Sequence, residues 1–276
     1  MRSWRNVLSA HLIFALMLVL ASCGGKTTST SASAAAPAPT PTPAPPAPTP
    51  SPTPGATPAA TVLSHVEEAP WLTCGACGNN GGTGPIAAYT DTLGIGTPSE
   101  DGSSTQFSIA ATVPFTNAYF YQQHTPVTDQ ITALKYEFDL YIPAGSETLP
   151  QAVEFECQQI LDGWVYNFSW QALYPGNQWR IFDYGLKRWD STGITLTRFT
   201  PNTWHHIVAE YHNDTTNHLV IHDALTVDGV RTPVNITHNA FLSGSHNQFT
   251  NAVQLDSNSA AAPYSVYVDN MKITYQ

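Results

Sequence analysis

The chain has 276 residues, of which 42% are hydrophobic and only 11% are charged, and it carries a formal net charge of −10. Twenty acidic residues against ten basic ones argue against nucleic acid and anionic glycans as partners, because both need compensating cations. The acidic excess grows after residue 63, since three of the basic residues and none of the acidic ones precede it. A neutral ligand is easier for such a surface to accommodate.

The N-terminal segment has the features of an export signal. Two arginines precede an apolar run over residues 7–20, and Leu-Ala-Ser-Cys follows, ending at Cys23. The segment resembles a bacterial lipoprotein leader, which implies a signal peptide over residues 1–22 and an acylated Cys23. An ordinary signal peptide or a short membrane anchor is the alternative, although the run is shorter than the roughly 20 residues of a helical span. The acylated Cys23 implies a lipid anchor in the bacterial cell envelope. An aspartate after it would favour retention in the inner membrane, but the residue is Gly24, so we expect the outer membrane or cell surface.

Residues 23–63 are expected to form a spacer. From Lys26 to Val62 the chain is almost entirely Thr, Ser, Ala and Pro. Such a tract cannot bury a core and favours extended polyproline II geometry, at about 3.1 Å per residue. The folded domain is therefore predicted over residues 64–276, as a monomer held away from the membrane.

The cysteines of the predicted domain are few. Cys74 and Cys77 lie in a Gly/Asn-rich loop, which does not suit a redox site at the start of a helix, and a zinc site would need a second pair. In an oxidising compartment we expect a local Cys74–Cys77 disulfide, with Cys157 free inside a strand.

Short segments of period two, separated by Gly, Pro, Asn and Asp, fill the predicted domain, and no stretch sustains the spacing of an amphipathic helix. This pattern predicts an all-β sandwich of two antiparallel sheets. The expected strands are residues 86–93, 105–112, 117–122, 132–142, 151–160, 164–173, 178–184, 193–199, 204–211, 218–227, 248–258 and 264–275.

Three of these strands have an apolar face and a polar face. Alternation places Leu134, Tyr136, Phe138, Leu140 and Ile142 on one face of the strand over residues 132–142. In the next strand Val153, Phe155 and Cys157 oppose the polar residues Glu154, Glu156 and Gln158. Near the C-terminus Val253 and Leu255 oppose Gln254, Asp256 and Asn258.

Several segments carry a family resemblance. They are the strand from Trp204 with its partner ending at Asp228-Gly229, residues 71–77, 151–156 and 251–256, and the final strand from Tyr264. They resemble concanavalin A-like jelly rolls, including laminin-G-like domains, and a group of secreted lipoproteins from soil bacteria such as acidobacteria. The resemblance implies a jelly-roll sandwich but not one function, since this fold hosts lectins, hydrolases, lyases and adhesion modules.

Glu154 and Glu156 are the first candidates for chemistry. Glucanases of this fold carry a nucleophile, a helper carboxylate and a general acid at alternate positions of one strand, and the resemblance would put the acid at Gln158 or Gln159. An amide cannot donate and recover a proton, so the general acid is missing from this strand. We therefore expect these side chains to bind sugar hydroxyls or to be solvated.

Aromatic residues are concentrated between residues 164 and 189. Sugar rings stack on exposed indoles, which makes Trp170 and Trp179 candidate ligand contacts, and Trp179 and Trp189 the pair expected to be exposed. The alternative is that the alternating Trp164, Tyr166 and Trp170 are core residues.

Metal binding is expected at most at one position. His205 and His206 point to opposite faces of a strand, so they cannot chelate one ion, and packing or pairing is the default for the other histidines. Asp269 resembles the final-strand aspartate of calcium-stabilised carbohydrate-binding jelly rolls, which implies a structural calcium. The alternative is a bulge whose aspartate bonds its own backbone. No other cofactor is expected.

The sequence leads to a surface-tethered domain that binds a neutral glycan through Glu154, Glu156, Gln158, Trp170, Trp179, Gln254, Asp256 and Asn258 without cleaving it. One alternative is a glycoside hydrolase on β-glucan-type polysaccharide, with Glu154 and Glu156 as catalytic residues and the acid supplied by Asp256 or Glu137. Another is a structural or adhesive envelope domain. Carboxyl groups of Glu154 and Asp256 that face each other in a groove would favour the hydrolase.

Overall fold

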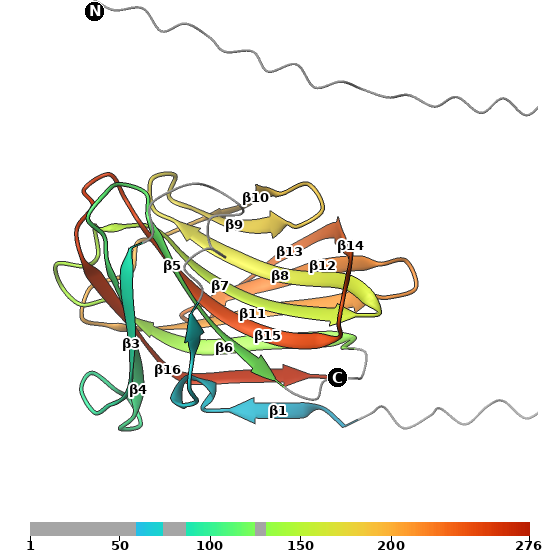
Figure 1. Cartoon of the computed structure of the whole chain (residues 1–276), viewed down its shortest axis with the longest axis horizontal. Helices are drawn as coiled ribbons and strands as arrows, with labels where there is room; N and C mark the ends of the chain where they lie inside the picture. The colour runs from blue at the N-terminus through green and yellow to red at the C-terminus, as the bar shows by residue number, and fades with distance from the viewer. Residues whose placement is uncertain (1–58, 74–86, 125–130) are drawn as a thin grey trace, which may run out of the picture. The chain divides into compact units, whose positions relative to one another are not determined.

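A computed structural model describes residues 59–73, 87–124 and 131–276, which all belong to one unit of the chain, Gly55–Gln276. Two eight-stranded antiparallel sheets face each other in a jelly-roll sandwich, which confirms the predicted fold class (Figure 1). Within the described ranges, no helix is long and apolar enough to cross a membrane. The signal peptide, most of the spacer and the pair Cys74 and Cys77 lie outside the described residues.

The two sheets are here called sheet 1 and sheet 2. Sheet 1 contains, in spatial order, β13 (Val230–Asn239), β12 (Leu219–Val227), β11 (Trp204–Asp214), β6 (Ala133–Tyr141), β16 (Tyr264–Tyr275), β4 (Ser104–Ala110) and β3 (Ala88–Ile95), with β1 (Thr61–Ser64) paired to β16. Sheet 2 contains β10 (Arg188–Thr195), β9 (Gln178–Asp183), β8 (Gly163–Leu173), β7 (Pro150–Leu161), β15 (Gln248–Ser257), β5 (Asn117–His124) and β2 (Leu72–Thr73), with β14 (Phe241–Ser245) paired to β8. A short 3-10 helix, η1 (Val66–Glu68), follows β1.

Strand alternation builds the core between the sheets. On β6, Phe138 is fully buried and its ring centroid lies 4.3 Å from that of Phe155 on β7. Trp170 on β8 contacts His222 on β12 edge to face, with ring centroids 5.9 Å apart. Each enclosed aromatic side chain removes a large apolar area from water, at about 25 cal/mol per Å². The polar partners of these core residues on β7, β8 and β15 therefore face away from sheet 1.

Asp228-Gly229, at the end of the strand that partners the one from Trp204, joins β12 to β13. Both residues have positive φ, 49° and 80°, which is the backbone of a tight hairpin turn. Asp228 accepts a hydrogen bond from the His206 amide at 3.0 Å, and its Oδ2 lies 2.8 Å from His205 Nδ1. His205 is buried, whereas His206 turns outward to Asp139, so the two histidines lie on opposite faces as predicted.

Strands β1, β2, β13 and β14 were not predicted, and β10 was misplaced. Strands β1 and β2 are short, and β1 begins at Thr61, before the expected domain boundary at residue 64. Strand β13 is an edge strand with Pro233 and an outward side that is solvent-exposed, so its pattern is weak. Strand β10 begins at Arg188 rather than at residue 193, and its pairing with β9 shifts between Ser191 and Thr195, around Gly193 with a φ of 76°.

Candidate functional site

A groove of about 650 Å³ lies on the face of sheet 2 that points away from the core. Its walls come from β5, β7, β8, β9 and β15, and its lining is rich in amide, carboxyl and aromatic side chains. This volume lies within the range of small-molecule sites. The lining residues used below are Tyr119, Tyr121, Glu154, Glu156, Gln158, Asn167, Gln171, Arg180, Phe182, Tyr184, Trp189, Gln254 and Asp256.

Most of the predicted site residues line this groove. Glu154, Glu156 and Gln158 lie on β7, and Gln254 and Asp256 lie on the neighbouring β15. Gln254 is directly opposite Glu154 in the register of the two strands. Side chains of one strand that are two residues apart share a face, so antiparallel pairing alone brings these five groups together.

Three predicted ligand contacts lie elsewhere. The prediction that Trp179 is exposed is wrong, because Trp170 and Trp179 are 1% and 2% exposed and face sheet 1 across the core. Their positions share the strand face of Ile181, which is fully buried. Asn258 follows β15 and donates to the Thr148 carbonyl at 2.7 Å, so it holds a turn outside the groove.

Glu154 and Asp256 form a coupled pair of carboxyl groups in the groove. Burial raises the pKa of Glu154 well above its ordinary value, and the negative charges of Asp256 and Glu156 raise it further. Burial also raises the pKa of Asp256 to about 6, while its hydrogen bonds with Glu154 and Gln254 act in the opposite direction. Burial and the two neighbouring charges therefore favour the protonated form of Glu154. Gln171 Nε2 donates to Glu154 Oε1 at 2.6 Å and fixes the orientation of the pair.

Glu156 lies two positions further along β7 and is partly exposed to the groove. Burial raises its pKa to about 7, against hydrogen bonds with Ser169, Tyr119 and Asn167 that favour the ionised form. The Tyr119 hydroxyl lies 3.5 Å from Glu156 Oε2. The groove thus holds three carboxyl groups whose pKa values are raised by burial, that of Asp256 to about 6 and that of Glu156 to about 7.

Aromatic rings and one cation border the carboxyl groups. Tyr119 and Tyr121 lie next to each other on β5, with ring centroids 5.8 Å apart. On the other side, Arg180 donates to the Trp189 carbonyl at 3.1 Å, and its guanidinium lies 5.9 Å from the centroid of the Trp189 ring. Among the lining residues, Arg180 is the single Lys or Arg side chain, opposed by three acidic ones.

Several lining residues were not singled out in the sequence. Tyr119 and Tyr121 alternate with the buried Ala118 and Phe120 on β5. This alternation was available as a signal, but nothing in the sequence showed that β5 is the neighbour of β15. Asn167 and Gln171 on β8 were not predicted either, because the sequence does not show which strands lie beside β8.

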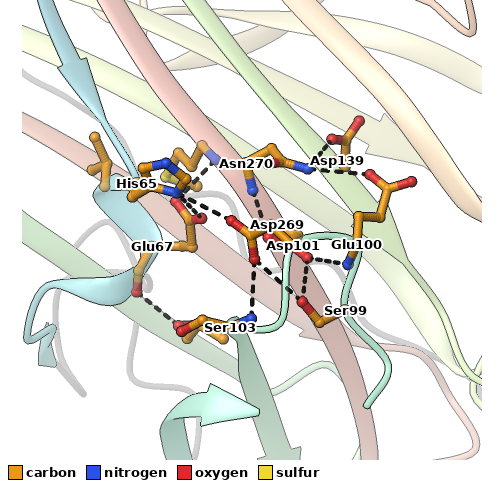
Figure 2. A network of polar contacts seen from close by, with 12 residues as sticks. His65, Glu67, Ser99, Glu100, Asp101, Ser103, Asp139, Asp269 and Asn270 are labelled. Atoms are coloured by element: carbon orange, nitrogen blue, oxygen red, sulfur yellow. Dashed lines mark hydrogen bonds and ion pairs between the residues drawn. The ribbon is translucent and has the colours of Figure 1, made fainter. Parts of the chain in front are cut away.

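A second polar cluster surrounds Asp269 on β16 (Figure 2). Asp269 is fully buried, and its Oδ2 accepts from Ser99 Oγ at 2.8 Å and from the Glu100 amide at 2.6 Å. Its Oδ1 accepts from the Asn270 amide at 2.8 Å, at a register shift between β16 and β6. The structure therefore shows the local bonding that was the alternative for Asp269, and three hydrogen bonds occupy its two oxygens.

The open oxygen in this cluster belongs to Glu67. The Glu67 side chain is fully buried; its Oε2 accepts from the Met271 amide at 2.9 Å, and its Oε1 accepts no hydrogen bond. His65, Glu67 and Asp101 can each bring one ligand atom within 4.8 Å of the others. Burial raises the pKa of Glu67 to about 7, with the nearby charge of Asp269 adding to it. His65 Nδ1 lies 3.8 Å from Glu67 Oε1 and 3.2 Å from Asp101 Oδ2, so it is the contact of both carboxylates in the absence of an ion. Carboxylate oxygens such as these two are ligands that a hard cation such as calcium prefers.

No protein-family model and no curated protein matches the chain. Similar solved structures include arcelin-5, a lectin-like defence protein from Phaseolus vulgaris, with 7% identity, 79% of this chain and 98% of that chain covered, and a TM-score of 0.45. An alginate lyase has 11% identity, 79% and 97% coverage, and a TM-score of 0.44. A family 11 carbohydrate-binding module from Clostridium thermocellum, in complex with a β-1,3-1,4-mixed-linked tetrasaccharide, has 16% identity, 78% and 94% coverage, and a TM-score of 0.39. At these scores the likeness assigns no activity to this chain, whose fold rests on its own strand order.

Proposed function

We propose that the groove of sheet 2 binds a neutral glycan. The observation that carries this proposal is the combination, in one groove, of amide and carboxyl groups with aromatic rings that border them. Sugar hydroxyl groups exchange hydrogen bonds with such groups, and the apolar faces of sugar rings pack on aromatic rings. Three acidic residues against the one cation of Arg180 disfavour an anionic polysaccharide.

Trp189→Ala is expected to weaken glycan binding about tenfold, because it removes a ring from the groove edge together with the contact of that ring with the Arg180 guanidinium. Affinity gel electrophoresis and calorimetry of the full chain on mixed-linkage β-glucan, β-1,3-glucan and galactomannan measure this, with alginate as the anionic comparison. Trp204→Ala is the matched control, because Trp204 lies on sheet 1, against Tyr141. Retention on none of the neutral polymers, or equal loss in both variants, would contradict the proposal.

A glycoside hydrolase is the second candidate, and the coupled pair Glu154 and Asp256 favours it. Burial and neighbouring carboxylates raise the pKa of Glu154 well above its ordinary value, which is the direction that a general acid requires. Glu156, ionised above a pKa of about 7, would act as nucleophile or base. Glu137 does not take part, because it lies on β6 in sheet 1 and pairs with Lys272 at 2.9 Å. Release of reducing ends from β-glucan by the full chain separates this candidate from a binding protein.

We also propose that the cluster in Figure 2 holds a structural calcium ion through Glu67 and Asp101, with Asp269 positioning the surrounding loop by its hydrogen bonds. The bound ion would neutralise carboxylates that are otherwise crowded around η1 and β16. No step of glycan binding depends on it.

Calcium is expected to raise the unfolding temperature of the full chain, because an ion that binds only the native state stabilises it by about 2.7 kcal/mol at a hundred times its Kd. Thermal unfolding in calcium chloride and in EDTA measures the effect. Glu67→Gln should remove it, whereas Glu68→Gln should retain it, since Glu68 is exposed in the same short helix. An equal calcium response in the two variants would exclude Glu67 as a ligand.

A further inference from the structure

A buried histidine without a hydrogen-bond partner lies at the open edge of the sandwich. His238 on β13 is 8% exposed, and neither of its ring nitrogens has a hydrogen-bond partner. An imidazole always has one nitrogen that can donate and, when neutral, one that can accept, so burying both without partners is unfavourable. The ring lies beside His222, which is also fully buried and has two unpartnered nitrogens; their centroids are 5.5 Å apart.

Two carboxylates from the other sheet face this histidine. Asp190 on β10 places its Oδ2 3.4 Å from His238 Nε2. Asp183, at the end of β9, is 7% exposed, and ligand atoms of the three residues all lie within 4.8 Å of one another. Register explains the convergence: Asp190 is paired with Ile181, whose side chain points into the core, and Asp183 is two residues further along β9.

Among the residues that the structure describes, the two carboxylates near His238 have one cationic side chain, that of Arg188, as an ion-pair partner besides the histidine. Asp190 pairs with Arg188 at 2.9 Å, and Asp183 Oδ1 accepts from the Leu186 amide at 2.9 Å. These contacts orient both carboxylates but satisfy neither nitrogen of His238. Nitrogen and carboxylate oxygen together are the donor set of zinc, whereas calcium prefers oxygen alone. His238 is buried beside its two carboxylates, whereas His65 in the cluster of Figure 2 is exposed to solvent, so the nitrogen is a fixed member of the donor set only here. Ligands of a tetrahedral zinc ion lie roughly 3.3 Å apart for bonds of about 2.0 Å, close to the separation between Asp190 and His238.

We propose that Asp183, Asp190 and His238 form a zinc-binding site that joins β13 of sheet 1 to β9 and β10 of sheet 2. Both β10 and β13 are edge strands, and they belong to different sheets, so no backbone ladder connects them there. Tyr184 and Trp189, which line the groove, directly adjoin Asp183 and Asp190 in sequence. A zinc ion here would therefore fix the hairpin of β9 and β10 (Figure 1). This hairpin carries Tyr184 and Trp189, two aromatic residues of the groove.

Calorimetric titration of the metal-free full chain with zinc chloride tests the proposal, with calcium chloride as the comparison. We expect one zinc site that is weakened at least tenfold in both His238→Gln and Asp190→Asn. Zinc should also raise the unfolding temperature of the unaltered chain but not of these variants. Glu67→Gln, which alters the other cluster, should bind zinc normally.

Circular dichroism is used to check that each variant is folded. If His238→Gln does not fold, the test rests on Asp190→Asn, because the Asp190 side chain is partly exposed. Zinc binding of unchanged affinity in a folded variant, including binding through Cys74 and Cys77, would overturn the proposal. A site that takes calcium but not zinc would overturn it as well.

Discussion

Glu154→Gln is expected to make the domain more stable at pH 8 and to flatten the pH dependence of its unfolding. The pKa of Glu154 is raised in the folded state, so its contribution to stability is fully present below its ordinary pKa and is lost as the pH rises toward the folded value. The loss is up to about 1.4 kcal/mol for each pH unit in that window. Glutamine carries no proton to lose, and its amide can donate to the Asp256 carboxylate in place of the shared proton.

Urea unfolding of the full chain at pH 5, 6, 7 and 8 measures this effect. Glu67 also has a raised pKa, but it lies outside the groove and contributes a similar decline in both proteins, which cancels in the comparison. Asp256 and Glu156 interact with Glu154, so the comparison reports the titration of these three carboxyl groups together. The gap between variant and unaltered chain should widen with pH. Glu68→Gln, at an exposed position, should leave the curve unchanged. Parallel curves for Glu154→Gln and the unaltered chain would show that the carboxyl pair does not share a proton.

The same variant separates the two functional candidates. A binding protein should retain its glycan affinity within a few-fold, because glutamine keeps the shape and the hydrogen bond of Glu154 with Gln171. A glycoside hydrolase should lose at least 100-fold in the release of reducing ends, because an amide cannot act as the general acid. Glu156→Gln should cause a comparable loss only in the hydrolase.

Trp170→Ala is expected to destabilise the domain by about 3–5 kcal/mol, the usual cost of removing a large aromatic side chain from a core. Trp170 is 1% exposed and contacts Trp179 and His222 edge to face. Chemical unfolding gives the free energy, and glycan binding of the fraction that remains folded should match that of the unaltered chain. Weaker binding at unchanged stability would return Trp170 to the role of a ligand contact.

The alternation of apolar and polar side chains along single strands predicted much of the core and the centre of the groove. The apolar sides of β6 and β7 face the core as expected, and the polar side of β7 with that of β15 forms the centre of the groove. Where both faces of a strand carry apolar or bulky side chains, their alternation does not show which face points into the core. On β8 and β9 the indoles of Trp170 and Trp179 proved to be inside, and Phe182 and Arg180 outside toward the groove.

Features that depend on contacts between strands far apart along the chain were not predicted from the sequence. Asp183, Asp190 and His238 approach because edge strands of different sheets meet, and no local pattern specifies that meeting. Glu67 contacts Met271, 204 positions further along the chain. Asp269 could be recognised as special, but whether its oxygens are free or occupied by Ser99 and Glu100 depends on the path of a loop.

The positions of β15 and β16 bear on how this domain folds. β15 lies between β7 and β5 in sheet 2, and β16 lies between β6 and β4 in sheet 1, although both follow all the other strands along the chain. Until residues 248–275 have been synthesised, each sheet lacks one of its interior strands, and β5 and β7 expose unpaired edges. The chain therefore remains open through nearly all of its synthesis and closes late, so a nascent chain stalled before Gln248 should remain sensitive to protease.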